Sequence, residues 1–139
     1  MIHSQLLADC HWLGRFEVCT VLLNRNAILP WFILVPDTEL EDVLDLPSER
    51  LNQVTAECQR ISGFLKQSLG YSKANFAGLG NVVPQMHLHI VARSSEDACW
   101  PQPVWGNLTE TASYTPETLA DWTAILVSEY GLEPSGHGH

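Results

Sequence analysis

Residues 84–93 read Pro-Gln-Met-His-Leu-His-Ile-Val-Ala-Arg, and polar and apolar residues alternate strictly from Gln85 to Ile90. This alternation has the period of a β-strand that buries one face. The apolar residues of the run are expected to point into a core, while the other face carries an amide and two imidazoles about 7 Å apart. Two histidines on one face are not needed for solvation, so Gln85, His87 and His89 are candidates for chemistry.

The composition indicates one domain with a net negative charge. The chain has 139 residues, and 45% of them are apolar, which is enough for one hydrophobic core. Its 16 acidic and 7 basic residues give a formal charge of −9. This balance argues against a nucleic-acid-binding protein, because phosphate contacts need a basic surface. A small phosphorylated ligand is compatible with it, since a pocket can be locally positive on an acidic protein.

The sequence predicts neither membrane insertion nor export. No stretch approaches the roughly 18 apolar residues of a membrane helix, and the first ten residues lack the basic and apolar regions of a signal peptide. The four cysteines form no Cys-x-x-Cys pair and are interpreted as reduced thiols. We therefore expect a soluble, cytoplasmic protein with neither a membrane nor a nucleic-acid partner.

The rest of the pattern predicts strands on both sides of one long helix. Residues 47–69 place apolar side chains at steps of three and four, as an amphipathic helix does, although Gly63 weakens the prediction for the last two turns. Thr115 and Pro116 are typical of the start of a helix, and Gly131 of its end. The other expected elements are a short helix over 4–12 and strands over 16–23, 31–35, 73–79 and 84–93.

The histidine strand resembles the motif of the histidine triad (HIT) superfamily of nucleotide hydrolases and transferases. The family motif is His-φ-His-φ-His-φ-φ, with φ apolar, and residues 85–91 read Gln-Met-His-Leu-His-Ile-Val. The family also has an apolar strand ending in proline about fifty residues earlier, which residues 31–36 match, and a long helix in between. An asparagine about ten residues before the motif and a Gly-Asn step shortly before it are matched by Asn75 and Gly80-Asn81.

The string from Gly80 to His89 is especially similar to a bacterial branch of small HIT hydrolases, as is Trp-Pro-Gln-Pro-Val-Trp-Gly at residues 100–106. That branch is often described as resembling diadenosine polyphosphate hydrolases. We expect a HIT domain over residues 1–112, followed by a C-terminal helix and flexible tail over 113–139.

The resemblance implies an α+β fold in which an antiparallel β-sheet packs against one long helix, joined here by the C-terminal helix. It also implies a homodimer, a purine nucleotide ligand, and cleavage of a nucleoside phosphoramidate or a dinucleoside polyphosphate. It requires no metal site and no cofactor, although Mg²⁺ can accompany a polyphosphate substrate.

The resemblance assigns the nucleophile to His87. A neutral imidazole nitrogen can attack the α-phosphorus of a nucleotide, and the resulting nucleotidyl-histidine splits one hard displacement into two easier ones. His89, on the same face, is expected to hydrogen-bond a phosphate oxygen or the bridging atom. The other candidates would hold phosphate or ribose through amide or backbone N–H groups, or else serve as turn and capping residues: Asn75, Asn81, Gly80, and Asn26 or its neighbour Asn24.

The chain departs from the family pattern at several positions. Gln85 replaces the first histidine of the triad, and because an amide cannot carry a proton, any relay through that position is in doubt. Trp31 replaces a histidine often found on the proline-bearing strand, and Val82 replaces a serine that could contact the leaving group. The basic stretch common after that strand reads Asp-Thr-Glu at residues 37–39.

Two alternative functions remain open at this stage. With glutamine at the first triad position, the chain could be a nucleotide-binding sensor with weak or no turnover. A metal-dependent enzyme of the cupin type also uses His-x-His on a strand, but it needs a nearby glutamate and a third histidine. Here the nearest acid is Glu96 and the next histidine is His137, so a metal site is poorly supplied with ligands.

Two further features also have more than one interpretation. Arg93 is either a surface charge or a group that steers phosphate. The loop over residues 100–106 has three interpretations: it closes over a nucleotide base, it packs at the edge of a subunit, or it covers the sheet.

Overall fold

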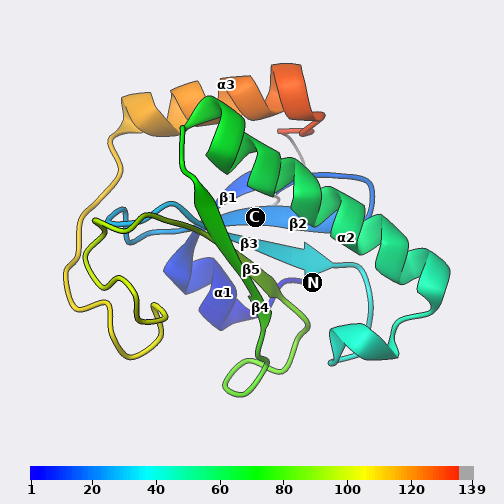
Figure 1. Ribbon diagram of the computed structural model, residues 1–139. Coiled ribbons are helices and arrows are strands. Elements are labelled where there is room, and N and C mark those ends of the chain that lie inside the picture. Colours follow the sequence, from blue (N-terminus) through cyan, green and yellow to red (C-terminus); the bar gives the residue numbers. More distant parts are fainter. Residues whose placement is uncertain (135–139) are drawn as a thin grey trace.

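A computed structural model describes residues 1–134 of the chain (Figure 1). Five antiparallel strands form one open sheet in the order β1-β2-β3-β5-β4. The strands are β1 (Cys10–Arg15), β2 (Cys19–Asn24), β3 (Trp31–Pro36), β4 (Lys73–Gly78) and β5 (Leu88–Arg93). The helices are α1 (Ser4–Asp9), α2 (Ser48–Gly63), the π-helical turn η2 (Phe64–Ser68), the 3-10 turn η1 (Val43–Asp45) and α3 (Pro116–Tyr130). The expected α+β fold is thereby confirmed.

Alternation along β3 separates two hydrophobic clusters. Phe32 and Leu34 pack in the main core with residues of α2 and α3. Ile33 and Val35 point to the other side and pack with Leu6 of α1. Figure 1 accordingly shows α2 and α3 on one side of the sheet and α1 on the other. Because both sides are covered, β3 reads as a continuous apolar run rather than as an alternating one.

The two predicted helices flanking the core match the structure closely. The regular turns of α2 end at Gly63, and the next turn is π-helical up to the left-handed Gly70, with φ of 82°. Thr115 caps α3 by accepting a hydrogen bond from the Thr118 N–H, and Gly131 ends it with φ of 80°. α3 packs on the same core as α2. The division at residues 112/113 stays a prediction, and the predicted flexible tail falls largely on residues 135–139, outside the described part.

The N-terminal segment differs from the prediction. α1 ends at Asp9, and the following residues form the edge strand β1 where a helix up to residue 12 was expected. β1 pairs with β2, and a bulge just before Gly14 brings that glycine so close to the backbone of Glu133 that a Cβ would overlap with it. Pairing with the sheet outweighs the local helical pattern here. β2 likewise starts at Cys19, three residues later than predicted.

The histidine strand differs from the prediction in two ways. Its ladder begins at Leu88, so Gln85 and His87 lie just before β5. Both of its faces are buried, since His87 and His89 are only 8% and 6% exposed. The apolar residues of the run do face the main core as predicted: Met86, Leu88 and Ile90.

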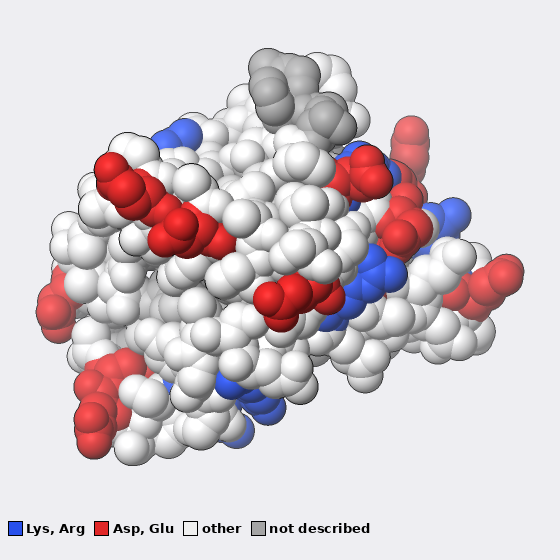
Figure 2. Space-filling view, turned by 90° about the horizontal axis from the view of Figure 1, so that it is seen from above, with Lys and Arg blue, Asp and Glu red and all other residues white. Residues whose placement is uncertain are grey.

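Charged side chains lie at the surface with few exceptions. Figure 2 shows acidic side chains dispersed over one face of the molecule, with basic side chains scattered among them. Among residues 1–134, each helix is too short or too polar to cross a bilayer.

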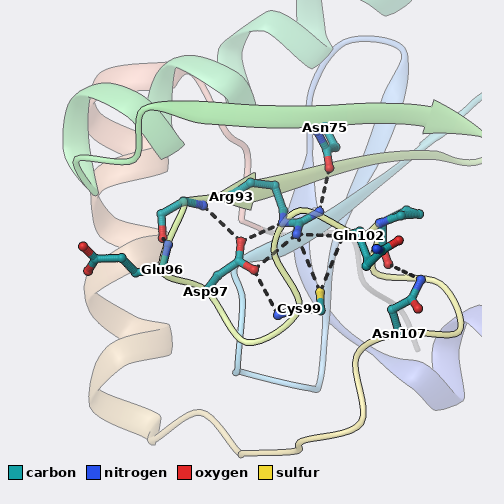
Figure 3. A network of polar contacts seen from close by, with 9 residues as sticks. Asn75, Arg93, Glu96, Asp97, Cys99, Gln102 and Asn107 are labelled. Atoms are coloured by element: carbon teal, nitrogen blue, oxygen red, sulfur yellow. Dashed lines mark hydrogen bonds and ion pairs between the residues drawn. The ribbon is translucent and has the colours of Figure 1, made fainter.

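Arg93, the last residue of β5, is buried in a network of polar contacts (Figure 3). The side chains of Arg93 and Asp97 are 1% and 3% exposed, and the Arg93 Nε donates to the Asp97 carboxylate at 2.7 Å. A second donor of Arg93 reaches the carbonyl oxygen of Gln102 at 2.8 Å. Arg93 is therefore neither a surface charge nor free to steer phosphate, and both interpretations of it are wrong.

The Asp97 carboxylate organises the loop that follows β5. It accepts backbone N–H groups of Ser94 and Cys99 as well as the Arg93 guanidinium. Burial by itself raises the pKa of Asp97, but these hydrogen bonds outweigh it and lower the pKa to about 2. The loop over residues 94–107 is thus built around one buried ion pair.

Replacing Arg93 with Met should lower the free energy of unfolding by about 3–5 kcal/mol, because Asp97 is left buried without its cation. Denaturant unfolding followed by circular dichroism measures the loss. Arg60→Met is the matched control: the side chains of its ion pair with Glu17 are 35% and 67% exposed, so solvent screens the pair and the loss there should stay below about 1 kcal/mol. Equal losses in the two variants would contradict the importance of the buried pair.

Candidate active site

A cavity of about 460 Å³ opens on the face of the sheet that α1 covers. Leu6 and Ile33 form an apolar part of its wall, and the loop between β4 and β5 forms another part. The polar side chains of the lining come from separate elements: Gln5 and Asp9 from α1, Asn24 from β2, Asn81 from the loop, and His87 and His89. An apolar cavity with a few converging polar groups is the usual form of a small-molecule site.

His87 is held through one ring nitrogen. Its Nδ1 lies 2.8 Å from the backbone carbonyl oxygen of Gln85. A carbonyl only accepts, so Nδ1 carries the proton and donates. The Nε2 of the neutral ring then keeps its lone pair, which is what a nucleophile at phosphorus requires.

His89 is held in the opposite way. Its Nδ1 accepts the indole N–H of Trp31 at 3.0 Å, so the proton of the neutral ring lies on Nε2. Burial, and then the neighbouring His87, lower the pKa of His89 to about 4. The centroids of the two imidazoles lie 5.0 Å apart. The site therefore presents one ring with a free lone pair beside one with a free N–H.

The side chain of Gln85 points elsewhere. Its Nε2 donates to the carbonyl oxygen of Met1 at 2.8 Å, and its Oε1 accepts the backbone N–H of His3 at 2.7 Å. Only the backbone of Gln85 reaches His87. The amide of Gln85 thus anchors, by two hydrogen bonds, the segment that leads into α1, and α1 forms one wall of the cavity.

The structure brings two of the candidate asparagines to the cavity. Asn24 and Asn81 both line it. Asn75 lies on β4 and accepts a hydrogen bond from the buried Arg93. Asn26 binds the backbone of residues 110 and 112 and is not part of the lining. Asn24 is the last residue of β2 and shares the face of Leu22, which packs with Ile33, whereas Asn26 lies beyond the end of the strand and is no longer held on that face.

Gly80 has the backbone freedom expected of it. Its φ of 67° is left-handed, and it lies in the loop that lines the same cavity as His87 and His89. Val82, at the position of the family's serine, is almost fully exposed in the same lining.

Two parts of the site were not predicted from the sequence. α1 contributes Gln5, Leu6 and Asp9, and no sequence signal links that helix to the histidines. Trp105, from the loop after β5, packs its ring edge-on against His89 with centroids 5.0 Å apart. The loop covers the sheet directly over the histidine face, and Trp105 also lines the cavity, while closure over a base and packing at a subunit edge stay predictions.

A metal-dependent cupin-type enzyme is contradicted by the fold. Cupins are double-sheet jelly rolls, whereas this sheet is single, open and five-stranded. Among residues 1–134, no three or more His, Cys, Asp or Glu side chains are close enough to hold a metal ion. His137 and His139 lie outside the described residues.

The comparisons with known proteins agree with this geometry. The HIT domain family matches residues 5–96. A solved histidine triad protein from Marinobacter aquaeolei VT8 is 38% identical, with a TM-score of 0.83 over 91% of this chain and 92% of that one. Histidine triad proteins from Bradyrhizobium japonicum and Sinorhizobium meliloti 1021 are 34% and 30% identical, each with a TM-score of 0.84 over 91% of this chain and 95% and 94% of theirs. No curated protein matches the chain.

The family match covers well over half of the chain, and the solved relatives share its whole fold. The chain belongs to the histidine triad family, a superfamily of nucleotide-binding hydrolases and transferases.

Proposed function

We propose that this protein cleaves a nucleoside phosphoramidate or a dinucleoside polyphosphate through a nucleotidyl-histidine intermediate on His87. The observation that carries the proposal is the hydrogen bond from the His87 Nδ1–H to the Gln85 carbonyl, which leaves the Nε2 lone pair available at the cavity. The resemblance of residues 80–89 and 100–106 to the bacterial branch similar to diadenosine polyphosphate hydrolases supports the same reaction class.

The proposed reaction has two displacements. The His87 Nε2 attacks the α-phosphorus, the bond from phosphorus to the leaving group breaks, and the leaving group takes a proton from solvent. Water then attacks the same phosphorus and gives up a proton to solvent, the bond to Nε2 breaks, and the nucleoside monophosphate leaves with His87 restored. In both steps the Nε2–H of His89 donates to a phosphate oxygen and stabilises the charge that develops there.

The lining of the cavity offers groups for each part of a nucleotide, and the family resemblance favours a purine. Asn24 and Asn81 can donate amide N–H groups to ribose or phosphate without adding charge. Leu6, Ile33 and Trp105 offer apolar surface for a base. In this proposal no metal or cofactor takes part in the chemistry, and Mg²⁺ enters only as the counterion of a polyphosphate substrate.

The protein should form a covalent adduct that depends on His87. After incubation with adenosine 5′-phosphoramidate or a dinucleoside polyphosphate and a mildly basic quench, the intact mass should rise by one nucleotidyl group. His87→Ala should abolish the adduct and lower turnover by a factor on the order of 10³. His11→Ala, which alters a histidine outside this cavity, should retain both. Tight nucleotide binding with neither adduct nor product, for several substrates, would favour the sensor instead.

We propose that Gln85 acts on the N-terminal segment rather than on a proton relay. Its side chain makes a pair of hydrogen bonds with the backbone of Met1 and His3, and its hydrogen bond with His87 is made by the backbone carbonyl. Gln85→Glu keeps the shape but replaces the donor by a second acceptor facing the Met1 carbonyl, so one of the two bonds becomes repulsive.

Gln85→Glu should therefore loosen the wall of the cavity. We expect faster amide hydrogen exchange over residues 3–9 and a KM raised about tenfold, with the single-turnover rate nearly unchanged. Gln85→His should not increase the single-turnover rate. A faster chemical step in Gln85→His would show that the first triad position does belong to a proton relay.

We propose that a second copy of the chain pairs along β4. β4 is an edge strand of the sheet, and its Phe76 is 54% exposed. Beside it, a groove of about 320 Å³ runs between α2 and β4. An exposed apolar edge strand favours pairing with an identical strand, which a two-fold axis allows. The other edge strand, β1, is bridged at Arg15 by Glu133.

Phe76→Asp should convert the dimer into a monomer, because it places a carboxylate at the centre of the proposed interface. Light scattering coupled to size-exclusion chromatography gives the mass in solution. Val127→Asp, an exposed apolar position on α3, serves as the control and should leave the mass unchanged. A wild-type protein that is monomeric at micromolar concentration would exclude this interface.

We also propose a cytoplasmic location. The four cysteines are free and buried in the structure, and such thiols persist in a reducing compartment.

A further inference from the structure

We infer that Trp31 is a positioning residue that holds His89 in a single neutral tautomer, so that His89 serves as a fixed hydrogen-bond donor and not as a proton relay. The catalytic part of this inference rests on the proposed function, whereas the tautomer assignment stands on the structure alone.

The register of the sheet brings the two side chains together. β3 and β5 pair with Trp31 opposite Val91 and Ile33 opposite His89. Trp31 and His89 are therefore diagonal neighbours on one face, at a separation that large side chains can bridge. The indole Nε1 lies 3.0 Å from the His89 Nδ1, and the ring centroids lie 5.9 Å apart.

The chemistry of the indole makes this contact one-directional. An indole N–H can only donate, so it stabilises His89 only while Nδ1 is unprotonated. An imidazolium, or the tautomer with the proton on Nδ1, would place two N–H groups against each other in a buried site. Trp105 packs against both rings, with centroids 5.0 Å from His89 and 5.7 Å from Trp31, and so holds the pair in place.

The two histidines of the site consequently have opposite tautomers. The Gln85 carbonyl keeps the proton of His87 on Nδ1, and the Trp31 indole keeps the proton of His89 on Nε2. One ring offers a lone pair and the other an N–H. The lowered pKa of His89, caused by burial and then by His87, agrees with a ring that stays neutral. Since the indole cannot accept a proton, no relay continues through Trp31.

Trp31→Phe tests the inference, because it keeps an aromatic ring and removes the donor. In protein labelled with ¹⁵N-histidine, the two ring-nitrogen chemical shifts report the tautomer at neutral pH. We expect His89 to be protonated on Nε2 in the wild type and to be a mixture of tautomers in Trp31→Phe. With a phosphoramidate substrate, kcat should fall about tenfold while KM changes by less than about threefold.

Trp105→Phe is the matched control for the spectroscopic measurement. It removes an indole N–H from the other tryptophan that touches His89, but that contact is between rings and involves no hydrogen bond to Nδ1. The tautomer of His89 should therefore stay as in the wild type. An unchanged His89 in Trp31→Phe, or a wild-type His89 protonated on Nδ1, would overturn the inference.

A second measurement needs no substitution. In wild-type protein labelled with ¹⁵N in tryptophan and histidine, a coupling across the hydrogen bond should connect Trp31 Nε1 with His89 Nδ1. Its absence in the folded protein would also overturn the inference. A tautomer shift in Trp31→Phe without any turnover in the wild type would leave the tautomer assignment standing and overturn the proposed hydrolase function.

Discussion

The pairing of β5 between β3 and β4 is the constraint on which the rest of the site depends. Because side chains alternate across a strand, a slip of one residue would turn both imidazoles into the main core and expose the apolar residues between them. Both faces of β5 are buried, so the hydrophobic clusters on the two sides specify the same register. The same pairing sets Trp31 diagonal to His89. Backbone register thus positions the two histidines independently of their polar contacts.

Polar contacts then give two identical side chains different properties. A backbone carbonyl leaves the lone pair of His87 available, and an indole leaves the N–H of His89 available. The buried ion pair of Arg93 and Asp97 affects the environment of His89 indirectly, because it stabilises the loop that places Trp105 against His89. Neither histidine needs an imidazole at position 85 for this arrangement, which is compatible with a glutamine there.

Much of the fold was predictable because it follows from local periodicity. The apolar patterns of α2, β3 and β5 each lie within a short run of neighbouring residues. The ends of α3 are marked by single residues that typically cap helices. β1 was not predictable, because its conformation comes from pairing with β2 rather than from its own pattern. For the site, His87 and His89 followed from the strand, but their partners did not. Trp31 is 58 positions from His89, and pairings at that separation require the tertiary structure. The burial of Arg93 was likewise not predictable, because no local sequence pattern distinguishes a buried arginine from an exposed one.

The contact of Gln85 with the N-terminal segment has a consequence for comparing relatives. Its partners are a main-chain carbonyl and a main-chain N–H, groups that nearly every amino acid supplies. The contact therefore does not depend on the side chains at positions 1 and 3, and no covariation between them and position 85 is needed to preserve it. Covariation between sequences would therefore not reveal this link between the triad strand and the first helix, and the glutamine would be noticed only as a missing histidine, although its side chain makes two hydrogen bonds to the N-terminal segment.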